Sequence, residues 1–369
     1  MSRCEDEFAI RFLSSAARQK VRVDEQLGIA SAFSDDIAID LGTANTLVHV
    51  EGRGIIIDEP SVVAVRPYRG GRELLAVGRK AKMLVRQAPK SIEEIHPLRD
   101  GFIADFEATE EMLRQFIKRA KTMLGFRRPR ILICLPAGAT PVERRAVHDT
   151  AKSLGARKVY LVAEPVAASL GVGLSLEEGT AVMVVDVGGG TTDIAVLSRG
   201  VVISARTLRC AGNAMDEAII RYVRRKHNLL IGPTNAERIK IEAGTAVAAL
   251  NGRAAEVHIR GRDVRSGLAK MAVLTPKDIA AALTEPVDKI ADFIERALED
   301  LPPDVLSEIT LRGIHLTGGG ATLNKLDAAL TRQVGIKVRA TQSPMHCVVK
   351  GSAIVLAELS QHEHLLMRP

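Results

Sequence analysis

The stretch VVDVGGGTTD, residues 184–193, determines how the rest of the chain can be interpreted. An apolar run reaches Asp186, three glycines follow, and Thr191 and Thr192 lead into a second apolar run, which predicts two strands joined by a glycine turn. Consecutive glycines let the backbone approach a ligand and leave several N–H groups pointing one way, which is how a backbone holds phosphate. Because glycine clusters also form ordinary hairpins, the motif alone leaves both interpretations open.

A second copy of this pattern occurs near the beginning of the chain. Residues 37–48, IAIDLGTANTLV, repeat the order of apolar strand, Asp, apolar residue, Gly, small polar turn, Thr and apolar strand. Asp40 and Asp186 occupy the same place in the two copies, where a carboxylate could hold the water shell of Mg²⁺. The repetition predicts a chain of two halves built on one plan.

A third glycine run, TGGGA at residues 317–321, follows an apolar stretch and precedes a predicted helix. A glycine turn that opens a helix suits the phosphate or sugar side of a nucleotide, because the helix N-terminus carries a partial positive charge. The chain contains neither a Walker A sequence nor a GxGxxG fingerprint. If these glycines bind phosphate, they therefore do so with a turn that differs from both of those motifs.

Composition limits the class of protein. The 369 residues, 46% of them apolar, are enough for two globular domains, and their apolar runs are shorter than the roughly 20 residues that cross a bilayer. With no recognisable signal peptide and four scattered cysteines, we expect a cytoplasmic protein with reduced thiols. The net charge of +7 is spread thinly and aromatic residues make up only 3%, which favours an acidic membrane surface as partner over nucleic acid.

Two segments are candidates for membrane contact. Residues 8–23 contain four basic residues and no acidic one, and Phe8, Phe12 and Leu13 share one side of a helix, which is typical of an interfacial helix on anionic lipid. A disordered start upstream of the biological initiation site is the alternative. Leu124 and Phe126 lie beside three arginines, and a loop folded back on the core is the alternative there.

Other polar residues lie where chemistry could occur. Glu164 stands at a strand-to-helix corner, where an α/β sheet places ligand groups, and it could orient the water that attacks a γ-phosphate. A first-turn glutamate favoured by the helix dipole is the alternative. In the predicted helix 236–250, Glu237 and Lys240 could flank a base or ribose, or form an ordinary ion pair. We interpret the final residues, with His362 and His364, as a frayed tail.

In this order, the motifs resemble the superfamily of actin, sugar-kinase and heat-shock-chaperone ATPases, and within it the MreB family of bacterial rod-shape-determining actin homologues. The resemblance extends from about Phe33 to Leu359. It includes IDLGTANTLV, DEPSVVAV, PLRDGFIADF, VERRAV, EPVAASLG, VVDVGGGTTDIAVLS, ERIKIE and LTGGGATL. LGTANTLV and RDGFIADF are specific to MreB rather than to the whole superfamily.

The resemblance implies an α/β fold, the actin-like arrangement of two lobes built from duplicated ribonuclease-H-like domains with small inserted subdomains. The expected boundaries are an N-terminal extension at 1–34, lobe I at 35–178 with an insertion at about 62–98, lobe II at 179–345 with an insertion at about 215–278, and a C-terminal helix at 346–369 that returns to lobe I.

It also implies that ATP and Mg²⁺ bind between the lobes. Thr43, Ala44 and Asn45 would line the first phosphate loop and Gly188, Gly189 and Gly190 the second. The adenosine side would be formed by Glu237, Arg238, Ile239 and Lys240, and the back wall by Gly318, Gly319, Gly320 and Ala321. Asp40 and Asp186 would hold the metal ion in place, while Glu164 and Thr191 would position the hydrolytic water.

The function implied is that of an ATP-dependent, membrane-associated filament protein with slow ATP hydrolysis. It would form paired filaments on the inner face of the cytoplasmic membrane and organise cell-wall elongation with RodZ-, MreC- and RodA-type proteins, which maintains rod cell shape. A chaperone-type ATPase and a small-molecule kinase of the same superfamily are the alternatives. The chain departs from the family pattern at Ala163, where relatives usually carry a second glutamate, at Asp193, where many have Glu, and at Arg127, beside Phe126.

Overall fold

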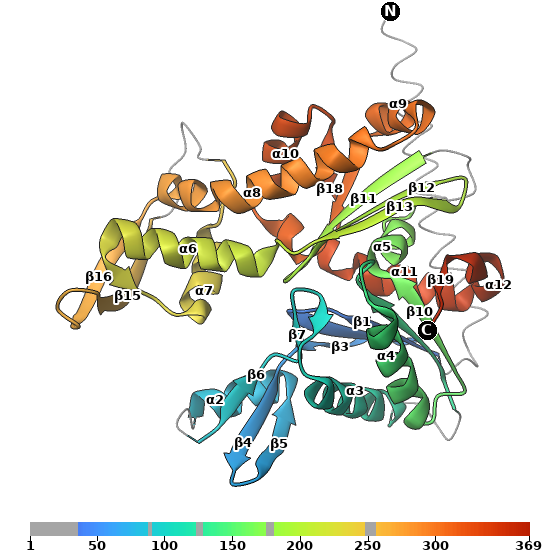
Figure 1. Ribbon diagram of the computed structural model, residues 1–369, viewed down its shortest axis with the longest axis horizontal. Coiled ribbons are helices and arrows are strands. Elements are labelled where there is room, and N and C mark those ends of the chain that lie inside the picture. Colours follow the sequence, from blue (N-terminus) through green and yellow to red (C-terminus); the bar gives the residue numbers. More distant parts are fainter. Residues whose placement is uncertain (1–35, 88–90, 123–127, 175–180, 248–255) are drawn as a thin grey trace, which may run out of the picture.

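The computed structural model describes residues 36–87, 91–122, 128–174, 181–247 and 256–369, and these residues form two lobes around two separate sheets (Figure 1). The first lobe has a six-stranded sheet in the order β19-β10-β9-β1-β2-β3. Its strands are β1 (Ile37–Leu41), β2 (Asn45–Val50), β3 (Gly54–Pro60), β9 (Arg130–Leu135), β10 (Lys158–Ala163) and β19 (Leu366–Met367).

The second lobe has a five-stranded sheet in the order β13-β12-β11-β17-β18. Its strands are β11 (Ala181–Val187), β12 (Thr192–Ser198), β13 (Val201–Leu208), β17 (Ile314–Thr317) and β18 (Val338–Ala340). In both sheets a motif-bearing hairpin, β1–β2 or β11–β12, is joined on its first strand by a parallel neighbour, β9 or β17. The two halves therefore share a plan, as the repeated motif predicts.

The strands alternate between two cores, because successive side chains of a strand point to opposite faces. In β11, Met183 and Val185 face the outer core of the second lobe, while Val182 and Val184 face a core between the sheets. Outer helices of the first lobe are α3 (Phe106–Lys121) and α4 (Pro141–Ser153). Those of the second are α6 (Gly212–His227), α7 (Pro233–Ala243), α8 (Pro276–Glu299), α9 (Pro303–Arg312) and α10 (Leu326–Val334). Buried apolar residues pack these helices against the sheets, which makes each lobe a stable platform for its motif.

Helices α5 (Glu164–Gly171) and α11 (Cys347–Ala357) lie between the two sheets. They cross at two glycines: a Cβ on Gly171 would overlap the carbonyl oxygen of Cys347, and a Cβ on Gly351 would overlap that of Ala167. The two helix backbones are therefore in direct contact. Glycine is required at both positions for packing rather than for a special backbone angle.

We expect Gly351→Ala to destabilise the protein, because the added methyl group must push the two helix backbones apart. Overpacking of this kind costs about 1–3 kcal/mol. Urea denaturation should show a lower midpoint with an unchanged slope. Gly232→Ala is the control, since a Cβ there would meet nothing within 4 Å. Equal midpoints for Gly351→Ala and the wild type would contradict this packing argument.

Each lobe carries a small insertion, and Figure 1 shows both on the same side of the molecule. In the first lobe it comprises β4 (Val63–Tyr68), β5 (Gly71–Val77), α2 (Gly78–Gln87) and β6 (Glu93–Ile95), with the sheet order β5-β4-β6. In the second, β14 (Leu229–Leu230), β15 (Val257–Asp263) and β16 (Ala269–Leu274) form a three-stranded sheet. A further short hairpin, β7 (Leu98–Arg99) and β8 (Phe102–Ile103), follows the first insertion.

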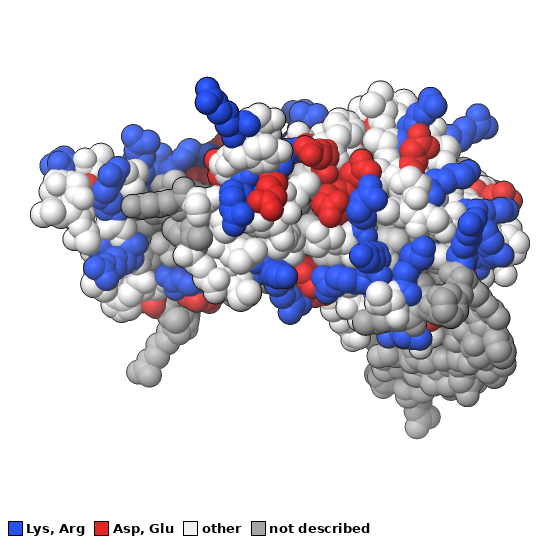
Figure 2. Space-filling model, turned by 90° about the horizontal axis from the view of Figure 1, so that it is seen from below, with Lys and Arg blue, Asp and Glu red and all other residues white. Residues whose placement is uncertain are grey.

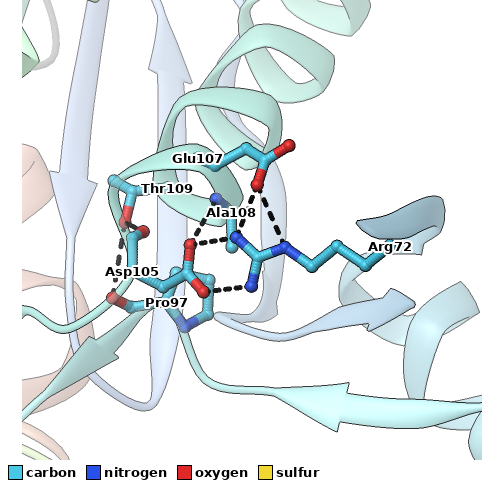
Figure 3. A network of polar contacts seen from close by, with 6 residues as sticks. All are labelled: Arg72, Pro97, Asp105, Glu107, Ala108 and Thr109. Carbon is cyan, nitrogen blue, oxygen red and sulfur yellow. Dashed lines mark hydrogen bonds and ion pairs between the residues drawn. The ribbon is translucent and has the colours of Figure 1, made fainter. Parts of the chain in front are cut away.

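A polar network fixes the first insertion to its lobe (Figure 3). Arg72 of β5 donates to both carboxylate oxygens of Asp105 and, at 2.7 Å and 3.0 Å, to one oxygen of Glu107. Asp105 is also the N-cap of α3 and accepts a hydrogen bond from the Ala108 N–H. The Arg72 guanidinium holds the pKa of Asp105 below its ordinary value. Because the carboxylate serves both partners, the insertion and the start of α3 have a fixed relative orientation.

The C-terminal residues are ordered, so the expectation of a frayed tail is wrong. Leu366 and Met367 form β19, which pairs with Val162 and Leu161 of β10, and Leu365 is buried. The His364 imidazole lies 2.9 Å from the carbonyl oxygen of Gly200. Backbone pairing and apolar burial hold this segment against both lobes.

Candidate functional site

The turns of the two motif hairpins meet where the lobes join. A Cβ on Gly189 would lie 2.6 Å from the Cβ of Ala44, and a Cβ on Gly190 would lie 2.9 Å from the hydroxyl oxygen of Thr43. Ala44 and Asn45 are exposed at this junction. Any side chain at the two glycines would separate the turns, so their backbones are available to a ligand that lies against both.

Asp40 and Asp186 lie at the ends of β1 and β11, directly behind these turns, and are 8% and 6% exposed. Burial, reinforced by the charge of Asp186, raises the pKa of Asp40 to about 8. Burial and the charge of Asp193 raise the pKa of Asp186 to about 7, although the Thr317 hydroxyl, 3.0 Å away, opposes that rise by donating to it. The lobes therefore bring together two carboxylates that repel each other.

Glu164 joins this group from the first turn of α5. Burial, followed by the charges of Asp193, Asp40 and Asp186, raises its pKa well above the ordinary value. Its Oε1 atom is buried without a hydrogen-bond partner among the described residues. A buried acceptor without a partner is costly to a fold and is a common feature of sites that bind a ligand or water.

Asp193 is the fourth carboxylate, which the sequence reasoning noted only as a departure from the family pattern. It is 1% exposed and accepts hydrogen bonds from the Thr207 hydroxyl at 2.5 Å and the Ala137 N–H at 3.2 Å. The Thr191 side chain also hydrogen-bonds to it and lowers its pKa, against the larger opposing effect of burial. Thr191 therefore contacts the carboxylate cluster through Asp193.

The carboxylates of this cluster suit a cation that is bound mainly through its water ligands. No group of three His, Cys, Asp or Glu side chains converges as a metal-ligand set within the described ranges. Mg²⁺ commonly keeps several waters and is bound by one or two carboxylates together with phosphate oxygens. Asp40 and Asp186 fit that role, because a cation between them would relieve their mutual repulsion.

The stability of the nucleotide-free protein should depend on pH in a characteristic direction. The folded-state pKa values of about 8 for Asp40 and about 7 for Asp186 lie above those of an unfolded chain. The folded protein therefore keeps protons that the unfolded chain has lost, and this contribution to stability decreases as pH rises from about 4 to about 8. Urea denaturation across this range measures it, and Asp186→Asn should flatten the profile. A profile that rises over the range and is identical in the variant would contradict the pKa assignment.

The third glycine run packs against the second motif. Gly318, with φ +83°, lies so close to Asp186 that a Cβ would overlap the carboxylate, and a Cβ on Gly320 would overlap the side chain of Val187. Gly319 begins a single 3₁₀ turn, η2 (Gly319–Thr322), whereas α10 begins only at Leu326. The run therefore opens a short 3₁₀ helix and precedes α10, as expected of a glycine turn before a helix, and its N–H groups belong to this one short turn. Ala321 is buried in the core of the second lobe.

The adenosine candidates on α7 point in different directions. Ile239 is buried in the core of the second lobe, and Arg238 is exposed and pairs with Glu242. Lys240 donates to the Gly212 carbonyl at 2.9 Å and to Asp216 at 2.8 Å, so its ion pair is not with Glu237. Of these four side chains, burial removes Ile239 from a ligand, whereas Glu237 and Lys240 are half-buried one turn apart.

Asp216, which the sequence reasoning missed, lies close to the second glycine turn. Its Oδ1 atom is buried without a partner among the described residues, and its other oxygen binds Lys240. Helix α6 reaches this turn directly, since the Gly212 N–H donates to the Gly188 carbonyl at 3.2 Å. Spacing alone could not find this residue, because its placement depends on how α6 packs against α7.

The β7–β8 hairpin reaches both motif turns. Its Asp100 and Gly101 have φ of +50° and +76°, and the Gly101 N–H donates to the Thr43 hydroxyl at 3.1 Å. A Cβ on Gly101 would overlap the methyl group of Thr191 in the second lobe. The Arg209 guanidinium lies 4.0 Å from the centroid of the Phe102 ring, which adds a cation–π contact between the lobes. The Asp100-Gly101 pair predicts a hairpin turn from the sequence alone, but the residues that this turn contacts depend on how distant segments pack.

The candidates for membrane contact, Phe8, Phe12, Leu13, Leu124 and Phe126, lie outside the described residues. Among the helices that the structure describes, none has the length and apolar character needed to cross a membrane.

Comparison with known proteins gives a consistent result over nearly the whole chain. A family model described as MreB/Mbl protein matches residues 34–364. The cell shape-determining protein MreB of Escherichia coli (strain K12) is 46% identical over 333 residues, which are 89% of this chain and 95% of that protein. At 20% identity, a MamK double helical filament has a similar fold, with a TM-score of 0.72 over 88% of this chain and 99% of that chain.

Crystal structures of MreB5 of Spiroplasma citri give TM-scores of 0.82 with ADP bound and 0.83 with AMPPNP bound. Their sequence identities to this chain are 34% and 33%, and each comparison covers 90% of this chain and 98% of the other. The actin-like, two-lobed α/β fold expected from the sequence is confirmed by these likenesses.

Proposed function

The chain belongs to the MreB/Mbl protein family, and on that basis we propose that it is an ATP-dependent, actin-like filament protein that determines cell shape. The observation that carries this proposal is the meeting of two glycine turns, one from each lobe, in front of the buried carboxylates Asp40, Glu164, Asp186 and Asp193. This arrangement suits a nucleotide whose phosphates bridge the lobes, so that the ligand contributes to how the lobes are held together.

The nucleotide would take its phosphate contacts from the backbone of both turns, 43–45 and 188–190. The likeness to MreB5 bound to ADP and to AMPPNP supports this assignment. Glu237 and Lys240 would face the adenosine, and the loop of Gly318, Gly319, Gly320 and Ala321 would close the other side. Asp216 adds a buried acceptor near Lys240 that could bind a ribose hydroxyl.

Asp40 and Asp186 would hold Mg²⁺ through its water ligands. When bound, the ion would supply charge neutralisation at the phosphates and relieve the repulsion between the carboxylates. Glu164 would accept a hydrogen bond from the attacking water at its unpartnered Oε1 and orient it. Thr191, through its contact with Asp193, would fix the neighbouring backbone. Slow hydrolysis is consistent with Ala163, which leaves one glutamate where relatives usually have two.

At the cellular level, the filaments would be paired, would lie on the inner face of the cytoplasmic membrane and would organise cell-wall elongation with RodZ-, MreC- and RodA-type proteins. Phe8, Phe12 and Leu13, together with Leu124 and Phe126, would provide the lipid contact. The relation to the cell shape-determining protein MreB of Escherichia coli supports this role.

Co-sedimentation tests the proposal directly. The full chain and a version starting at Leu27 would be centrifuged with ATP, with and without anionic liposomes. We expect both to form filaments and the full chain to bind liposomes more strongly, because the shorter version keeps only Leu124 and Phe126 for lipid contact. If neither assembles under any of these conditions, the filament function is wrong even if nucleotide binding persists.

A further inference from the structure

A surface pocket of about 370 Å³ lies between the end of β3 and helix α2. It is lined by Pro60, Arg79, Lys82, Met83, Arg86 and Gln87. Pro60 pairs with Asn45 in the β2–β3 ladder, so the pocket borders the first glycine turn without including it. The pocket therefore belongs to the insertion of the first lobe and is separate from the nucleotide site proposed above.

The lining contains three cationic side chains and no carboxylate. Arg79 donates from its guanidinium to the Asp58 carbonyl, and its backbone N–H donates to Glu59 at 3.2 Å. Within the described residues, Lys82 and Arg86 form no hydrogen bond or ion pair. Figure 2 shows Lys and Arg spread along one face of the molecule, with Asp and Glu among many of them. The pocket lining therefore gathers three cations and no carboxylate, although Glu59 of β3 lies beside Arg79.

Two cations of helix α2, Arg79 and Lys80, lie at the end where the helix dipole disfavours positive charge. The first turn has no acidic residue and begins Gly78, Arg79, Lys80, although cations are unfavourable at a helix N-terminus. Glu59 of β3 offsets part of this cost by accepting from the Arg79 N–H. A sequence that breaks a local rule in this way commonly does so for a binding site.

We propose that this pocket binds a phosphate-bearing anion. The guanidinium of Arg86 presents planar N–H pairs that match phosphate oxygens, Arg79 adds the guanidinium N–H groups that it does not use on the Asp58 carbonyl, and Lys82 supplies a third charge. Met83, 51% exposed, and Pro60 offer apolar contact for the remainder of the ligand. The phosphate can come from a free phosphorylated compound or from the headgroup of an anionic lipid, which the following experiment separates.

The test uses the full chain with its nucleotide site saturated by AMPPNP. Inorganic pyrophosphate is titrated by calorimetry as the free phosphate probe, and flotation with phosphatidylcholine vesicles, with or without phosphatidylglycerol, serves as the lipid probe. The variant is Lys82→Ala combined with Arg86→Ala. Its matched control is Lys80→Ala, an exposed cation on the same helix that does not line the pocket.

We expect the double variant to lose affinity for one probe by about tenfold or more, since each charge-assisted hydrogen bond contributes substantially to binding. Lys80→Ala should change that affinity by less than about twofold. Loss of pyrophosphate binding identifies a free phosphorylated ligand, and loss of phosphatidylglycerol binding identifies a lipid headgroup.

The proposal is overturned if neither probe binds the wild type, or if Lys80→Ala has the same effect as the double variant. It is also overturned if only polyglutamate, added as an acidic polypeptide, distinguishes the double variant from the wild type. AMPPNP uptake is measured separately in each variant. If the wild type takes up no AMPPNP, the proposed nucleotide site is wrong. If the double variant binds both probes as the wild type does, the proposed pocket is wrong.

Discussion

Replacing Asp186 with alanine is expected to weaken the binding of magnesium-ATP by about 10- to 100-fold, the range typical of losing a group that orients a metal through its water ligands. The carboxylate lies behind both glycine turns, 6% exposed, and its pKa of about 7 reflects burial and the nearby charge of Asp193. Without this carboxylate, the magnesium ion that neutralises the phosphates would be held by Asp40 alone. Equilibrium titration with a fluorescent ATP analogue, at fixed magnesium concentration, measures the effect.

The same substitution should have the opposite effect when magnesium is removed with a chelator. One negative charge facing the phosphates disappears, so the affinity for free ATP should stay the same or rise. Thr317→Val is the matched control, because it removes the hydroxyl that donates to Asp186 but leaves the carboxylate in place. Its effect on magnesium-ATP should be smaller. Equal losses with and without magnesium would show that Asp186 supports the fold and does not bind the ion.

The parts of the candidate site that could be located from the sequence are those whose position is fixed locally. The β1–β2 and β11–β12 hairpins could be located because apolar strands, an aspartate and a glycine turn are consecutive in the chain. Alternation within β11 follows from the strand period, which is why Met183 and Val182 face different cores. The sequence pattern is sufficient to locate a turn or a strand face when its geometry depends only on residues close together in the chain.

Contacts that depend on packing between distant segments could not be found from the sequence. Asp193 meets Thr207 because the β12–β13 register places them opposite each other. Asp216 reaches Lys240 only through the packing of α6 against α7. Strand β19 has two residues, too few to show any periodicity before it pairs with β10.

One boundary error had a signal in the sequence. The helix expected at 236–250 ends at Ala243 and is followed by Gly244. Glycine is the usual residue after a helix, and a Cβ at Gly244 would overlap the Lys240 carbonyl. The apolar residues beyond it extended the apparent helical pattern, but the stop signal was present.

Replacing Glu164 with glutamine is expected to leave magnesium-ATP binding nearly unchanged and to slow hydrolysis by about 100-fold or more. Glutamine keeps the volume of the buried side chain but removes the negative charge that would accept a proton from water and orient it. Single-turnover hydrolysis, with nucleotide affinity measured in parallel, separates the chemical step from binding.

The structure supplies a control that distinguishes catalysis from helix support, the alternative that the sequence left open. Glu143 is also a buried glutamate in the first turn of a helix, but its oxygens are occupied by the Ile103 N–H at 3.0 Å and by Thr140 at 2.7 Å and 2.9 Å. Glu143→Gln should therefore lower the unfolding midpoint and leave the hydrolysis rate per folded molecule unchanged. Glu164 has an oxygen with no such partner. Glu164→Gln should therefore slow hydrolysis and leave the unfolding midpoint nearly unchanged. A Glu164→Gln variant that hydrolyses ATP at the wild-type rate but unfolds more easily would assign this residue to the helix dipole, and the attacking water would need another base.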